Sequence, residues 1–178
     1  MPAFVDAVLA DTGTGKVDMV AHSMGAWAGR WYIKFLGGET KIRDYVSLAG
    51  TNHGNNAACL FAPFSESSAE LCPAYAGDGD SENNIQFLLN GEPSVEDVDE
   101  TPFGIEDGGE IAWHAMWAGL DEVVYPNTSA CLNQTSRNDC SDPINKIAAW
   151  TFHLQMIQSQ AVFDQVEIWL RERNISRP

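Results

Sequence analysis

A serine at the junction of a predicted strand and a predicted helix is the residue of this sequence best placed to do chemistry. Ser23 is the middle residue of AHSMG at 21–25, which follows an apolar run at 17–20 and precedes a helical pattern. In a sharp strand-to-helix turn the serine hydroxyl points away from the backbone, and the residues two before and two after it come close together. We therefore interpret Ser23 as a nucleophile and expect bulky side chains at Ala21 or Gly25 to clash. The alternative is a serine that only caps the helix.

The helix expected after Ser23 would assist such chemistry. Its first N–H groups have no partners within the helix and favour an anion beside the serine, so the backbone N–H of Met24 is the expected oxyanion donor. Small residues at Ala26, Ala28 and Gly29 would let this helix pack closely on a sheet.

A nucleophilic serine needs a base, and the base needs an acid that orients it. With a strand–turn–helix serine the expected chain order is serine, acid, histidine, with both partners on loops after strands. Of the four histidines, His153 follows the apolar segment IAAWTF and precedes the last helical pattern, so it is the predicted base. The others fit less well, because His22 adjoins the serine and is interpreted as structural, His114 lies inside a predicted strand, and His53 precedes every suitable acid.

The predicted acid is Asp121, which ends the segment AWHAMWAGL within GLDEVVYP. Glu122 is adjacent and would point elsewhere, whereas Asp139 and Asp142 lie in a cysteine-containing loop and follow no strand. The competing interpretations are a turn-forming Asp121 and a surface His153 at the end of a strand.

The elements that must position these residues alternate along the chain, which predicts an α/β fold with a mostly parallel sheet and flanking helices. We expect one domain over 1–178, with a long acidic, lid-like excursion at 52–110 and a second polar excursion at 126–143. The first helix should bury one face, formed by Phe4, Val5, Val8 and Leu9, and end at Gly13. The last helix should bury Ile157, Val162, Val166, Trp169 and Leu170. The expected elements are helix 1–12, strand 16–20, helix 25–36, strand 41–49, a helical piece at 83–89, strand 110–119, strand 145–152 and helix 156–173.

Composition excludes several classes of protein. The chain has 178 residues, 44% of them hydrophobic, and a formal net charge of −15. Such a charge repels phosphates, so no nucleic-acid partner is expected. No apolar run is long enough to cross a bilayer. The acid is concentrated in the middle, since no Lys or Arg occurs between Arg43 and Arg137.

The four cysteines form two sequence-local pairs, which suggests the disulfides Cys59–Cys72 and Cys131–Cys140, although four cysteines allow three connectivities. Disulfides imply an oxidising compartment. The sequons at Asn127, Asn133 and Asn174 are compatible with an extracellular location. No cofactor is expected, with calcium as the alternative, because DGDSEN at 78–83 resembles the start of a calcium loop but lacks the later glutamate.

Four stretches resemble the secreted class 2 lipases of the α/β-hydrolase superfamily. They are VDMVAHSMGAWAGRWYIKFLGG, VSLAGTNHG, the segment from DETPFG to AMWAGLDEVVYPNTSACL, and FHLQMIQSQAVFDQV. Carried over by position, the resemblance implies a triad of Ser23, Asp121 and His153 and an ester or lipid substrate, with transient contact to a lipid interface. Trp27, in the helix after Ser23, and His53, just after the second predicted strand, are candidate substrate-binding residues because both are expected near the active edge. Trp27, Met24, Met116 and Trp117 either line an acyl pocket or belong to the core.

The same resemblance implies a preceding strand and a His-Gly-type loop that supplies the second oxyanion donor, and no stretch of this chain matches them. No signal peptide is visible either. We therefore expect an N-terminally incomplete chain that is weakly active and prone to associate. The alternatives to ester hydrolysis are acyl transfer by the same triad, and an inactive fragment or binding module.

Overall fold

The computed structural model describes residues 1–73, 85–90, 99–135 and 138–175 of the chain. Four strands form one sheet in the order β1 (Val17–His22), β2 (Ile42–Leu48), β3 (Ala112–Ala118) and β4 (Asn145–Ala148). Every neighbouring pair is parallel. The predicted α/β class with a parallel sheet is therefore confirmed.

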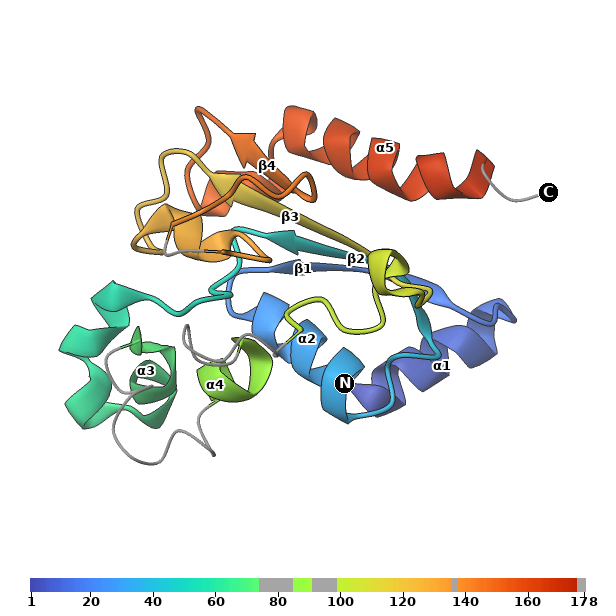
Figure 1. The fold of residues 1–178 in the computed structure, drawn as a ribbon, viewed down its shortest axis with the longest axis horizontal. Coiled ribbons are helices and arrows are strands. Elements are labelled where there is room, and N and C mark those ends of the chain that lie inside the picture. Colours follow the sequence, from blue (N-terminus) through green and yellow to red (C-terminus); the bar gives the residue numbers. More distant parts are fainter. Residues whose placement is uncertain (74–84, 91–98, 136–137, 176–178) are drawn as a thin grey trace.

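Helices cover both faces of this sheet (Figure 1). Helices α1 (Pro2–Thr12) and α2 (Gly25–Phe35) lie on one face and α5 (Gln160–Ile175) lies on the other. Neighbouring residues of β2 serve different faces, since Tyr45 packs in the α1–α2 core and Val46 packs against α5. Because both faces are covered, most residues of the central strands β2 and β3 are buried, including the polar Asp44 and Ser47 of β2.

Helix α2 packs closely on β2 at Gly29. A Cβ atom at Gly29 would lie 2.6 Å from Cε2 of Tyr45, and Ala26 is fully buried beside it. Two expectations for this segment are wrong. Ala28 is exposed, and a Cβ atom at Gly25 would meet no described atom within 4 Å. Gly25 is the first residue of α2, and a side chain there would point into open space. The turn therefore does not require a glycine at position 25. The position that requires a glycine is Gly29, where the helix packs against Tyr45.

Helix α1 ends where the sequence predicts, because Gly13 adopts the left-handed conformation (φ 66°) and its N–H binds the Leu9 carbonyl. The predicted apolar face is only partly correct. Val5 is buried and Leu9 packs against the core, but Phe4 is 73% exposed. Phe4 lies about 100° around the helix from Val5, which places it beyond the buried stripe.

The last strand is shorter than predicted. Strand β4 ends at Ala148, and residues 149–152 turn away before a 3-10 helix at Leu154–Ile157. Helix α5 therefore begins only at Gln160, and Ile157, expected on its buried face, is 60% exposed in the preceding 3-10 helix. The buried residues of α5 include Val162, Val166 and Trp169.

The excursions are held by disulfides and by cations of α2. The bonds Cys59–Cys72 and Cys131–Cys140 are both present, and short helices α3 (Glu66–Leu71) and α4 (Ile85–Asn90) lie within the first excursion. The Arg30 side chain, 1% exposed, donates to the carbonyl oxygens of Asn52, Leu89 and Glu100. No pattern in the sequence predicts this role for Arg30. The calcium-like segment at 78–83 lies outside the described residues.

Within the part of the chain that the structure describes, no helix combines the length and the apolar character required to cross a membrane.

Candidate active site

Three turns at the same edge of the sheet bring Ser23, Asp121 and His153 together. Ser23 follows β1, Asp121 follows β3 and His153 follows β4. The Ser23 Oγ atom lies 2.9 Å from Nε2 of His153, and Nδ1 of His153 lies 2.9 Å from Oδ2 of Asp121. The carboxyl ends of parallel strands are the usual location of sites in such sheets. These side chains form a continuous hydrogen-bonded chain from hydroxyl to carboxylate.

The backbone at Ser23 is in an unusual conformation. Its φ of 57° lies in the left-handed region, which residues other than glycine rarely adopt. The Ser23 N–H donates to the Leu48 carbonyl of β2 at 3.0 Å, so the sheet holds the turn in place. Strain of this kind is typical of functional turns. Met24 is the N-cap of α2, so its N–H is among those without an intrahelical acceptor.

The Asp121 carboxylate uses its two oxygens differently. Oδ1 accepts the N–H groups of Val123 and Val124 at 2.9 and 2.8 Å, and Oδ2 faces His153. Burial of the carboxyl opposes ionisation, but the hydrogen bonds to His153 and to the two N–H groups outweigh burial and lower the pKa of Asp121. A carboxylate at Oδ2 requires a proton on Nδ1 of His153, which leaves Nε2 free to accept the Ser23 proton.

A buried asparagine holds the loop that carries Asp121. The Asn55 side chain donates to the Val123 carbonyl at 2.9 Å and accepts the Tyr125 N–H at 3.1 Å. Asn55 was not predicted as a site residue from the sequence, where its only signal is the turn-rich stretch TNHGNN after β2.

Two further side chains contact the main chain of His153. The Nε2 atom of His22 lies 3.1 Å from the His153 carbonyl oxygen, and the two imidazole centroids are 4.7 Å apart. The Glu122 carboxylate accepts the His153 N–H at 2.9 Å. The sequence predicts a structural role for His22 and a Glu122 side chain that points elsewhere. In the structure Glu122 leaves the imidazole to Asp121 but does bind the histidine backbone.

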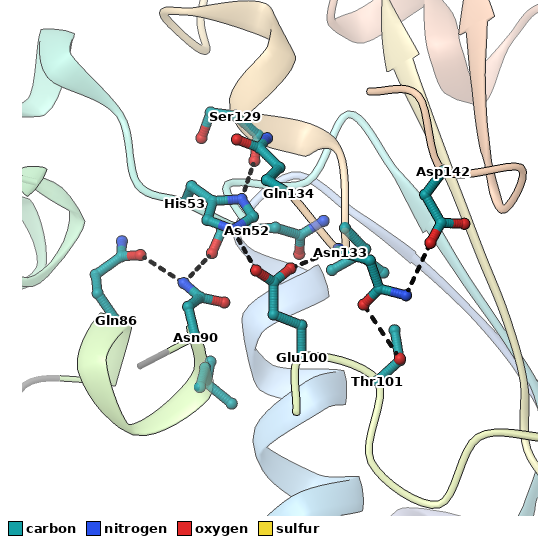
Figure 2. A network of polar contacts seen from close by, with 12 residues as sticks. Asn52, His53, Gln86, Asn90, Glu100, Thr101, Ser129, Asn133, Gln134 and Asp142 are labelled. Atoms are coloured by element: carbon teal, nitrogen blue, oxygen red, sulfur yellow. Dashed lines mark hydrogen bonds and ion pairs between the residues drawn. The ribbon is translucent and has the colours of Figure 1, made fainter. Parts of the chain in front are cut away.

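His53 lies in a separate polar network at the start of the first excursion (Figure 2). Its Nε2 atom lies 3.0 Å from Oε1 of Glu100, and its Nδ1 atom lies 3.4 Å from the Ser129 carbonyl oxygen. The other Glu100 oxygen accepts the Asn133 N–H at 2.6 Å. Burial opposes ionisation of Glu100, yet the contact with His53, the buried Arg30 and the Asn133 N–H together lower the pKa of Glu100. This network links the two excursions, and a substrate contact by His53 stays a prediction.

The residues considered for an acyl pocket divide by burial. Trp27 and Met116 are 4% and 3% exposed, and Met116 packs in the core cluster beneath α5. Met24, next to Ser23, is half exposed. Exposed apolar residues also flank the other two site residues: Leu120 and Val123 beside Asp121, and Phe152 and Leu154 beside His153. Each of the three predicted site residues therefore has an exposed apolar residue close to it in the chain, although the exposed Glu122 also lies beside Asp121.

The described residues contain no group of three or more His, Cys, Asp or Glu side chains arranged to hold a metal ion.

The sheet is parallel, and a serine with a left-handed backbone conformation lies between one of its strands and a helix. This arrangement is typical of α/β hydrolases. Residues 1–78 match the family model described as Lipase (class 2). This match confirms the resemblance to the class 2 lipases and supports a lipase or esterase function. It includes the Ser23 turn and ends before Asp121 and His153, so it does not bear on those two residues.

Proposed function

We propose that this protein hydrolyses carboxylic esters through an acyl-enzyme formed on Ser23. The observation that carries the proposal is the hydrogen-bonded chain from Ser23 Oγ through the His153 imidazole to Asp121, with both contacts at 2.9 Å. The match to class 2 lipases supports the same reaction class independently.

In the proposed mechanism, Nε2 of His153 accepts the Ser23 proton as Oγ attacks the ester carbonyl carbon. The oxygen that becomes negative is stabilised by the Met24 N–H at the start of α2. His153 then gives its proton to the leaving alcohol, which departs and leaves the acyl group on Oγ. Water, deprotonated by the same Nε2 atom, attacks this ester; the imidazolium then returns the proton to Oγ as the acyl C–Oγ bond breaks, which releases the acid and restores free Ser23. Asp121 stabilises the imidazolium and keeps the proton on Nδ1 throughout.

The proposed substrates are esters with an apolar acyl chain, because exposed apolar side chains flank all three residues. Transient contact with a lipid interface follows from the same surface. The two disulfides support an extracellular, oxidising location.

The test compares wild type, Ser23→Ala and the control Ser67→Ala on p-nitrophenyl esters of increasing acyl length. Ser67 is an exposed serine of α3, outside the proposed site. We expect Ser23→Ala to lose at least a thousandfold in kcat/KM, Ser67→Ala to keep wild-type turnover, and longer acyl chains to be preferred to acetate. Equal turnover by Ser23→Ala and wild type would refute the proposal.

A further inference from the structure

The peptide groups of His153 are bound from two sides by side chains of the other two site turns. His22 directly precedes Ser23 and reaches the His153 carbonyl, while Glu122 directly follows Asp121 and reaches the His153 N–H. The same carbonyl accepts the Met156 N–H at 3.3 Å, as expected at the start of a 3-10 helix. The Ser23 turn and the Asp121 turn therefore each supply one residue to the hydrogen-bonded chain of Ser23, His153 and Asp121. Each of these turns also supplies an adjacent residue that binds the backbone of His153.

The backbone of His153 needs such contacts because the sheet does not hold it. Strand β4 ends at Ala148, five residues earlier, and His153 is the N-cap of a four-residue 3-10 helix that makes poor hydrogen bonds. Proton transfer requires the imidazole within hydrogen-bond reach of Ser23, and small displacements are costly.

We infer that His22 and Glu122 are positioning residues for His153, holding its peptide groups so that the imidazole stays aligned between Ser23 and Asp121. The inference rests on the proposed ester hydrolysis. Because a carbonyl oxygen only accepts, the His22 Nε2 atom carries the proton in this contact. Glu122 accepts through a carboxylate, and a hydrogen bond to a charged group is the stronger kind.

Charge around His153 is consistent with this role. Asp121 is the anionic group that faces the imidazole and stabilises the imidazolium formed during turnover. Burial lowers the pKa of His22, and the charge of the nearby His153 imidazole acts in the same direction. The hydrogen bond to the His153 carbonyl and the charge of Asp121 act in the opposite direction but do not outweigh burial. His22 is therefore neutral at pH 7 and places no opposing cation 4.7 Å from the working imidazole.

The experiment removes each contact and then restores it. His22→Phe keeps a ring but removes the N–H donor, and His22→Gln restores an N–H donor. Glu122→Ala removes the acceptor of the His153 N–H, and Glu122→Gln restores an acceptor oxygen. The matched control is His114→Phe, since His114 stacks on Trp169 of α5 and not on His153. Each variant is measured for kcat and KM on a short p-nitrophenyl ester, for melting temperature, and for the low-field proton resonance of His153 Nδ1–H.

We expect His22→Phe and Glu122→Ala each to lower kcat about three- to tenfold with KM within twofold, because each removes one hydrogen bond. The Nδ1–H resonance should broaden or shift in both, and the Gln variants should recover most of kcat. His114→Phe should keep wild-type kcat and resonance. If His22→Phe or Glu122→Ala does not fold, the corresponding Gln variant provides the test. The positioning role then predicts that the Gln variant keeps most of the wild-type kcat and an unchanged Nδ1–H resonance.

Ser23→Ala, measured in parallel, separates the two ideas. Full activity in Ser23→Ala would overturn the proposed function itself. Loss of activity in Ser23→Ala, with wild-type kcat and resonance in His22→Phe and Glu122→Ala, would overturn the positioning role alone. A fall in kcat that the Gln variants do not recover would also overturn it, since hydrogen bonding would not be the cause.

Discussion

The unequal use of the two Asp121 oxygens predicts that Asp121→Asn inactivates the protein without unfolding it. Oδ1 accepts two N–H groups of the following turn, so the asparagine oxygen should stay at that position. Its NH₂ group must then face Nδ1 of His153, where a carboxylate oxygen now lies at 2.9 Å. An amide donor there favours the tautomer with the proton on Nε2. That nitrogen faces Ser23 and can no longer accept its proton.

The expected effect on catalysis is much larger than the effect on folding. A wrong tautomer in a Ser–His–Asp arrangement costs about 10⁴ in kcat, equivalent to about 5 kcal/mol of activation free energy. The free energy of unfolding should fall by only about 1–2 kcal/mol, because the two backbone bonds persist and only one charge-assisted bond is weakened.

The assay measures kcat on p-nitrophenyl butyrate at pH 7.5, chosen as about neutral, together with the denaturant-induced unfolding curve. The control is Asp139→Asn, because Asp139 is a partly exposed acid outside the proposed site that also accepts a local backbone N–H, from Ser141. The control should keep wild-type kcat. Retention of more than about a tenth of wild-type kcat by Asp121→Asn would refute the tautomer argument, as would an equal loss in Asp139→Asn.

Three further predictions concern stability. Gly29→Ala should lower the free energy of unfolding by about 1–3 kcal/mol because its methyl group would lie 2.6 Å from a buried tyrosine ring atom, whereas Gly25→Ala should leave it unchanged or raise it by up to about 1 kcal/mol; equal melting temperatures in the two variants would contradict the packing argument. Glu100→Gln should destabilise the protein by about 1–3 kcal/mol at neutral pH. Since folding lowers the pKa of Glu100, its stabilisation is present above the unfolded pKa and disappears as pH falls through the folded one; the wild-type advantage should therefore shrink below about pH 4, and a pH-independent difference in urea unfolding would count against it. Replacing both cysteines of the Cys131–Cys140 bond, which are 9 residues apart, by alanine should cost about 2–3 kcal/mol in a calorimetric or denaturant measurement, and an unchanged unfolding midpoint would show that the loop is held by its other contacts.

The positions of the elements were largely predictable because hydrophobic periodicity and glycine stops are local signals. Strands β1 to β3 and helices α1, α2 and α4 lie within a few residues of the predicted ranges. The end of β4 was not predictable. The run 145–152 has a continuous apolar stretch at 147–150, but only its first four residues pair with β3, after which the chain turns toward His153.

The sequence correctly predicted that small residues allow close packing of the helix, but not at which position the close contact occurs. The sequence pattern indicated close packing somewhere between Ala21 and Gly29. The position where a side chain would clash is Gly29, and the residue that it would meet is Tyr45 of strand β2, which follows α2 in the chain. A local pattern contains no information on which side chain of a distant segment will meet a given glycine.

The amino-acid sequence was enough to predict the strand–turn–helix around Ser23 and the α/β class, and chain order was enough to propose Asp121 and His153 as partners of the serine. The folded chain was needed to show that these residues lie within hydrogen-bond distance, and that His22, Glu122 and Asn55 bind the turns around them. The physical reason is that local propensity acts over a few residues, whereas a contact between residues about 130 positions apart depends on strand order and register. Four parallel strands that end at one edge of the sheet bring such residues together.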